Sequence, residues 1–162
     1  MESVNESLMG SRSSVLDALG SAGWAYGRRV STESWAQQLT AAGFELNDAA
    51  PKVWAALGHL TIGSAPGRLT PSSLRIDPVD ACIDTVAEAS ALRLRYAENY
   101  SPLGMWSVQF RAYAAASGRV VAVGPNVLWH LGSTLVEALG YVVDGDGGVD
   151  RAERAVWLAN CP

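Results

Sequence analysis

The chain has few residues of the kinds that carry metal or redox chemistry. Its two cysteines, Cys82 and Cys161, lie far apart and form no Cys-x-x-Cys pair. Its two histidines, His59 and His130, occur in no HxxxH or HExxH pattern. We therefore expect neither a zinc site nor a disulfide framework, and we predict that the protein uses no cofactor and no metal.

Lysine is almost absent. Lys52 is the only lysine among twelve basic residues, and the arginines are dispersed along the chain, whose formal net charge is −4. Proteins that bind nucleic acid usually carry clustered basic residues, because contacts to the phosphate backbone supply much of the affinity. The charge balance therefore disfavours direct nucleic-acid binding. It favours a basic protein partner, which an acidic surface attracts over long range.

Long apolar runs and catalytic signatures are also missing. No stretch of about eighteen apolar residues is present to span a membrane. The N-terminus carries Glu2 and Glu6 and lacks the layout of a signal peptide, so we expect a cytoplasmic protein. Segment 63–68 lacks the ending of a phosphate loop, and segment 144–150 lacks the key glycine of a calcium loop. We therefore predict that the protein is not an enzyme.

The residues that are present predict one α+β domain, with helices first and a hairpin-rich sheet later. Their 49% hydrophobic content is that of a globular protein with a proper core. We expect a flexible N-terminus over 1–12, a domain over 13–143, and a C-terminal extension over 144–162 that contains a short helix or an edge strand. The expected helices lie near 14–22, 32–42, 48–57, 78–91 and 134–143, and the expected strands near 60–62, 74–76, 106–113, 120–123 and 127–129.

An acidic pattern marks the predicted helix 78–91. Asp80, Asp84 and Glu88 recur every four residues, and Asp77 precedes them by one turn. Residues at this spacing share one face of a helix, and no basic residue lies among them. The pattern fits a solvated face, and it also fits a docking strip for a basic partner. We predict these four carboxylates as partner-binding residues.

A corner follows the first predicted helix. Gly23 stands where the apolar pattern ends, and a glycine there can take the left-handed conformation. Trp24, Gly27 and Arg28 come next. We expect Trp24 to pack where elements meet and Arg28 to anchor a carboxylate or a backbone carbonyl. Trp24, Arg28 and Trp129 are secondary candidates for partner contact.

Several short segments follow one another in an order and spacing that resemble the third group of the SUKH superfamily of bacterial immunity proteins. These segments lie at 22–30, 53–60, 76–81, 102–104, 117–120 and 129–139. The resemblance runs over about 15–143 and departs from the family pattern at His59, which replaces a glycine. It implies helices packed on a mixed, largely antiparallel sheet, with neither catalysis nor a cofactor. The residues that we assign to the fold signature are Gly23, Trp24, Gly27, Arg28, Gly118, Arg119, Trp129 and Gly132.

The resemblance also implies a partner. Members of this family look like antidotes in polymorphic toxin systems, which bind a cognate toxin domain, frequently a nuclease, and occlude its active site. The alternative is a non-catalytic interaction or scaffold module whose cellular partner is unrelated to toxins. A gene neighbour that encodes a secreted multidomain toxin would favour the first hypothesis. An enzyme would instead show a deep pocket with converging titratable groups.

Overall fold

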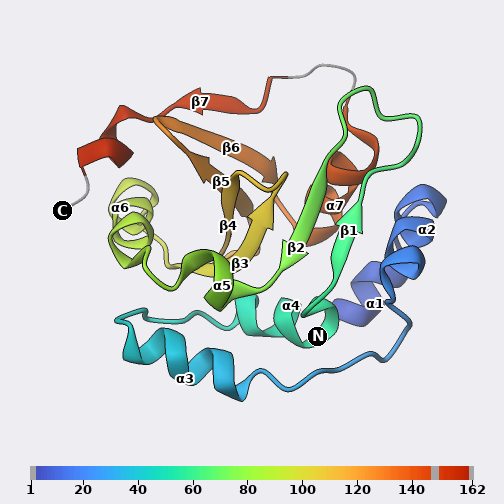
Figure 1. Cartoon of the computed structure of the whole chain (residues 1–162), viewed down its shortest axis with the longest axis horizontal. Coiled ribbons are helices and arrows are strands. Elements are labelled where there is room, and N and C mark those ends of the chain that lie inside the picture. Colours follow the sequence, from blue (N-terminus) through green and yellow to red (C-terminus); the bar gives the residue numbers. More distant parts are fainter. Residues whose placement is uncertain (1–2, 147–149, 161–162) are drawn as a thin grey trace.

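A seven-stranded sheet forms the centre of the molecule (Figure 1). The computed structural model describes residues 3–146 and 150–160. The strands lie in the sheet in chain order, and every described pairing is antiparallel. The predicted α+β class is confirmed, but these pairings make the sheet antiparallel and not mixed. The strands are β1 Thr61–Gly63, β2 Ser73–Ile76, β3 Tyr100–Trp106, β4 Phe110–Ala115, β5 Val120–Gly124, β6 Val127–Gly132 and β7 Ala152–Arg154.

Different helices cover the two faces of the sheet (Figure 1). Helix α7 packs against β6 and also contacts β1 and β2, so the sheet curves around it. Helices α5 and α6 pack over the other face, against β3. Because both faces are covered, β5 and most of β3 are buried throughout. The helices are α1 Val4–Met9, α2 Ser13–Ala22, α3 Glu33–Ala41, α4 Ala49–Leu57, α5 Pro78–Cys82, α6 Val86–Tyr96 and α7 Leu135–Asp144, followed by the 3₁₀ helix η1 Val156–Asn160. In the described residues, none of the helices has the length and apolar character needed to cross a bilayer.

The expected helix over 78–91 is two helices, which corrects the sequence prediction. Helix α5 ends at Cys82 and α6 begins at Val86. The Thr85 hydroxyl and backbone N–H both donate to the Cys82 carbonyl, which closes a turn between the helices. The Thr85 hydroxyl also lies 2.6 Å from the Tyr113 hydroxyl of β4, so a contact with the sheet holds the break.

The expected strand over 106–113 is a hairpin. Strand β3 ends at Trp106 and β4 begins at Phe110. Ser107 and Val108 both have positive φ, 53° and 64°, and turn the chain back on itself. The alternating pattern did not reveal this turn, because neither residue is the glycine or asparagine that such turns favour.

Both ends of the chain add elements to the domain. Residues 1–12, expected to be flexible, contain α1, whose Ser3 and Glu6 form a reciprocal capping box. In the C-terminal extension, β7 pairs with β6 and η1 follows it, so the edge strand and the short helix are both present. Part of that extension, including Cys161, lies outside the described residues.

Gly104 of β3 lies directly against the backbone of β2. A Cβ atom there would stand 1.8 Å from the carbonyl oxygen of Arg75. We expect Gly104→Ala to lower the free energy of unfolding by about 2 kcal/mol or more, because backbone on β2 must move. Urea denaturation followed by tryptophan fluorescence measures this loss. The control is Gly67→Ala, whose Cβ would meet nothing within 4 Å. Equal stability of the two variants would contradict the close approach.

Candidate functional site

Two of the four predicted partner-binding carboxylates surround Arg75. Asp77 caps α5, because its side chain accepts the N–H of Asp80 at 3.1 Å. Arg75, on β2, lies 3.5 Å from the Asp77 carboxylate and 3.1 Å from that of Asp80. Asp80 is 64% exposed, whereas Asp77 is 19% exposed. Asp77 therefore serves the start of the helix, and the Asp80 carboxylate faces solvent.

The other two carboxylates point in different directions. Asp84 is exposed in the link between α5 and α6. Glu88 turns toward the sheet, where Arg111 of β4 donates to both of its oxygens at 2.7 and 2.6 Å. The Tyr113 hydroxyl donates to it as well, at 2.7 Å. The structure therefore separates Glu88 from the exposed carboxylates. Arg111 is the residue that could have indicated this inward contact, because a half-buried arginine within a strand needs a carboxylate or carbonyl partner.

Burial and charge shift the pKa values around this ion pair. The hydrogen bonds from Arg111 to Glu88 raise the pKa of that guanidinium, so it stays charged. Burial, together with the nearby Glu88 charge, raises the pKa of the Cys82 thiol to about 12. Burial also raises the pKa of Tyr113 well above its ordinary value. The cluster therefore holds a protonated thiol and phenol against one ion pair, which suits a structural contact rather than nucleophilic chemistry.

The corner after α2 is part of the scaffold. Gly23 ends α2 with φ 109°. The Trp24 ring is buried, and its indole N–H donates to the side chain of Asn5 at 2.9 Å, which ties α1 to the domain. Arg28 donates to the carbonyls of Ala56 and Gly58, at 3.0 and 2.9 Å. The expectation that Arg28 anchors a backbone carbonyl is confirmed.

The later signature residues also shape the backbone. Gly118 forms the β4–β5 turn with φ 96°, and Gly27 has φ 86°. A Cβ at Gly132 would stand 2.4 Å from the backbone nitrogen of Ala138, so α7 can start directly against the end of β6. Arg119 lies over the Tyr96 ring, 5.9 Å from its centroid.

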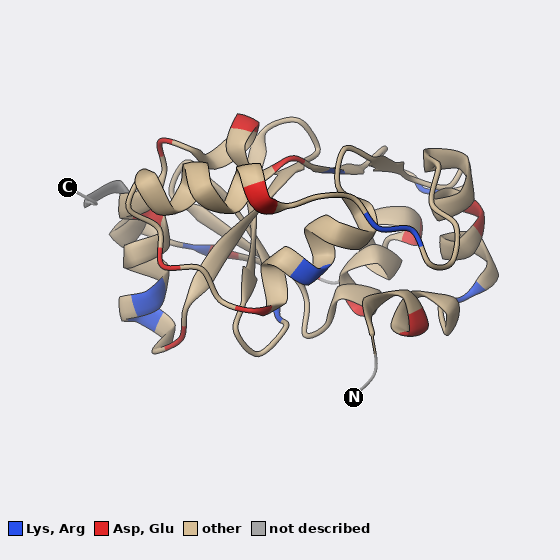
Figure 2. Cartoon of the chain, turned by 90° about the horizontal axis from the view of Figure 1, so that it is seen from below, with Lys and Arg blue, Asp and Glu red and all other residues tan. Residues whose placement is uncertain are grey.

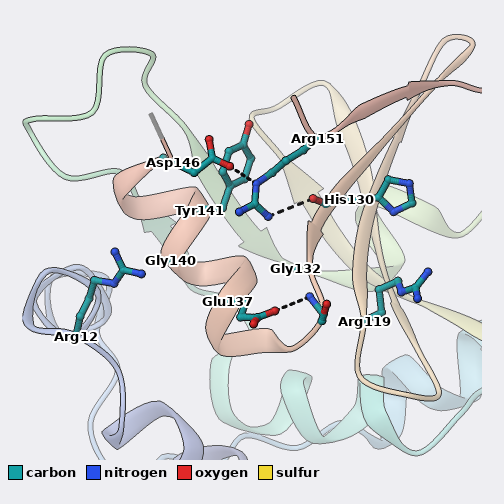
Figure 3. Close-up of a pocket in the computed structure, with 11 residues that line it drawn as sticks. Arg12, Arg119, His130, Gly132, Glu137, Gly140, Tyr141, Asp146 and Arg151 are labelled. Carbon is teal, nitrogen blue, oxygen red and sulfur yellow. Dashed lines mark hydrogen bonds and ion pairs between the residues drawn. The ribbon is translucent and has the colours of Figure 1, made fainter. Parts of the chain in front are cut away.

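A polar hollow of about 550 Å³ opens beside these residues, between α7 and the ends of β6 and β7 (Figure 3). Two of its charged groups, Arg151 and Glu137, are engaged within the hollow. Arg151 pairs with Asp146, donates to the Leu131 carbonyl at 2.8 Å, and lies 4.4 Å from the Tyr141 ring centroid. Glu137 accepts the N–H of Ser133 at 2.9 Å. The described residues include no group of three or more His, Cys, Asp or Glu side chains placed to hold a metal ion.

His130 lies at the edge of this hollow and belongs to a cluster on the opposite face of the sheet from α7. Its Nε2 atom is 3.5 Å from the Glu153 carboxylate, which also accepts the hydroxyl hydrogen bond of Tyr96. That hydrogen bond lowers the pKa of Glu153, and the nearby His130 adds to the effect. The cluster links α6, β6 and β7.

Figure 2 shows acidic and basic positions interspersed along the elements on the face that it presents. Asp80, in α5, and Asp84, in the link that follows, are the members of the predicted acidic strip whose carboxylates face solvent. We call this pair of residues the α5–α6 corner.

A comparison of two alanine variants tests whether Glu88 stabilises the fold and the exposed Asp84 does not. We expect Glu88→Ala to lower the free energy of unfolding by about 2–3 kcal/mol, because it leaves the half-buried Arg111 guanidinium without its partner. Asp84→Ala is the matched control and should change stability by less than about 0.5 kcal/mol. Urea denaturation compares them. Similar values would show that Glu88 is an ordinary surface acid.

Tyr96→Phe tests the lowered pKa of Glu153. The variant removes the O–H that stabilises the carboxylate, so the pKa of Glu153 should rise toward its ordinary value in a carbon-13 NMR titration. A lowered pKa gives stability above the unfolded pKa that is lost as pH falls through the folded pKa. The unmodified chain should therefore lose more stability on acidification than the variant. An unchanged Glu153 titration would contradict this assignment.

Comparison of the chain with models of known protein families gives a match. A family model described as SUKH-3 immunity protein matches residues 11–145, which span every element from α2 to α7. Neither a curated protein nor a solved structure matches the chain. The family resemblance predicted from the sequence is confirmed.

Proposed function

Because the chain belongs to the SUKH-3 immunity protein family, we propose that it binds a cognate toxin domain and neutralises it by occluding the active site. The family match over residues 11–145 carries this proposal. The toxin domain is a nuclease of a polymorphic toxin system, and the chain acts in the cytoplasm without catalysis of its own. It binds the toxin and not the toxin's nucleic-acid substrate.

Charge supports a nuclease as the partner. A nuclease binds phosphate groups, so the surface around its active site is basic. The chain is acidic, and its described arginines are largely engaged by its own carboxylates and carbonyls, as Arg28, Arg111 and Arg151 show. Complementary charge speeds association and suppresses wrong partners.

The exposed part of the acidic strip is the proposed contact. Asp80 and Asp84 present carboxylates at the α5–α6 corner, while Asp77 and Glu88 hold the scaffold that positions them. The ion pair between Asp80 and Arg75 is exposed on both sides, and such pairs contribute little to stability. A basic residue of the toxin can therefore replace Arg75 at little cost.

Co-expression tests the proposed function. The chain is expressed with toxin-like domains encoded beside its gene, and growth rescue and a stable complex are scored. Rescue together with complex formation is the expected result. A chain that rescues growth from none of these domains, and binds none of them, would favour the scaffold alternative.

Charge reversal tests the contact. We expect Asp80→Lys/Asp84→Lys to weaken toxin binding by about a hundredfold, because two attractive contacts become repulsive. Asp17→Lys, which reverses an exposed charge on α2, is the matched control and should bind as the unmodified chain does. Titration calorimetry measures all three. If the double variant binds like the control, the contact lies elsewhere on the molecule.

A further inference from the structure

A groove of about 970 Å³ opens at one end of the sheet, away from the α5–α6 corner. The β3–β4 turn, the loop between β1 and β2, and the C-terminal end of α7 surround it. Figure 1 shows that loop projecting from the sheet beside α7. Ala65 donates its N–H to the Val143 carbonyl at 2.8 Å, and Arg68 donates to the Tyr141 carbonyl at 3.2 Å. The groove walls are therefore fixed to each other.

Aromatic rings form the floor of the groove. Trp106 is buried, and its ring centroid lies 5.2 Å from that of Phe110, 5.1 Å from that of Trp129 and 6.0 Å from that of Tyr141. The last three side chains are only half-buried, and all four line the groove. An open cluster of this kind is unusual, because aromatic side chains gain most from full burial.

These rings already attract guanidinium groups of the chain itself. Arg68 and Arg151 lie over the Tyr141 ring, 5.1 and 4.4 Å from its centroid. No described lysine or arginine lies over the rings of Phe110 and Trp129. A planar guanidinium stacks on such faces, which carry negative electrostatic potential. Phe110 and Trp129 pack against Trp106 on one side and are only half-buried, so their remaining exposed ring surface favours a further cation of this shape.

Two exposed apolar side chains lie on or beside the lining of the groove. Leu69, on its lining, is fully exposed, and Val108 is 81% exposed at the tip of the β3–β4 turn, whose Ser107 and Gln109 line the groove. Val108 also has φ 64°, which costs a β-branched residue energy. Backbone strain and exposed apolar side chains are both features that proteins show at binding surfaces, so their presence here indicates one.

The lining of the groove carries three carboxylates and the guanidinium of Arg68, which is held by backbone carbonyls. Asp144 pairs with Arg12, and Asp146 pairs with Arg151, so these carboxylates are neutralised. Asp150 is exposed, lines the groove, and has no ion-pair partner among the residues that the structure describes. Its Oδ1 atom accepts the N–H of Ala152 at 3.0 Å, and the exposed carboxylate can still accept from an incoming cation.

We propose that this groove is a docking surface for an arginine side chain of a protein partner, with apolar neighbours of that arginine seated on Leu69 and Val108. The guanidinium stacks over Phe110 and Trp129 and reaches the Asp150 carboxylate. The toxin domain supplies the arginine, and in that respect alone the inference rests on the proposed function. The groove is a second contact, distinct from the α5–α6 corner.

A blocked amino acid tests the cation site on the isolated full chain. N-acetyl-arginine methylamide is titrated while NMR follows the Trp129 indole N–H, assigned by comparison with Trp129→Phe. The control ligand is N-acetyl-citrulline methylamide, which has nearly the same shape and no charge. We expect saturable shifts with arginine, and binding about threefold or more weaker with citrulline. Equal binding of the two ligands, or no saturable shift, would overturn the proposal.

Two variants locate the site. Phe110→Leu removes a ring face, and Asp150→Asn removes the open carboxylate from an exposed position, so the second variant folds in any case. Each should weaken arginine binding about twofold or more, whereas Asp84→Asn, at the α5–α6 corner, should leave it unchanged. Arginine binding that is unchanged in both groove variants would place the cation elsewhere and overturn the proposal.

Toxin binding then separates this inference from the proposed function. If arginine binds in the groove and no toxin domain forms a complex, the cation site stands and the proposed function fails. If a toxin complex forms and Phe110→Leu and Asp150→Asn bind it as tightly as the unmodified chain, the proposed function stands and this inference fails. A weakened complex in both variants supports both.

Discussion

A half-buried ion pair between Glu88 and Arg111 determines how the acidic segment sits on this domain. It joins α6 to the middle of the sheet, and the Tyr113 hydroxyl contacts both Glu88 and Thr85 from the same strand. Glu88 turns inward and Thr85 closes the turn at the break, so that this segment forms two helices instead of one. The two short helices leave Asp84 outside, in the link between them.

Elements that depend on local sequence patterns are predictable in this chain, whereas elements that depend on contacts between distant residues are not. Helices α2, α3, α4 and α7 and the turns at Gly118 and Asn126 follow from local patterns of apolar residues, caps and glycines, and the structure confirms them. The break after α5 depends on Tyr113, which is distant in sequence, so the local pattern cannot reveal it. The β3–β4 turn was missed for a different reason, since Val108 adopts a conformation that β-branched residues disfavour. Helix α1 could have been found from its Ser-x-x-Glu capping box.

The candidate site was predictable only in part. The spacing of Asp77, Asp80, Asp84 and Glu88 is visible in the sequence, but their directions depend on Arg75 and Arg111, which the sheet register brings to them. The aromatic groove was not predicted, because its residues come from the β1–β2 loop, the β3–β4 turn, β6 and α7. For Arg28 the sequence predicts an anchor to a carboxylate or a backbone carbonyl, and the structure selects the carbonyls of Ala56 and Gly58.

The scaffold and the exposed carboxylates together support the proposal that the protein acts by binding. Family membership gives the class of partner, and the α5–α6 corner gives the proposed electrostatic contact. Signature residues such as Trp24 and Arg28 hold the scaffold in shape. The most direct test of this account is a titration of the toxin's nuclease activity with the purified chain. The account predicts that activity falls in proportion to added chain and vanishes near one equivalent. Full nuclease activity in the presence of excess chain would contradict it.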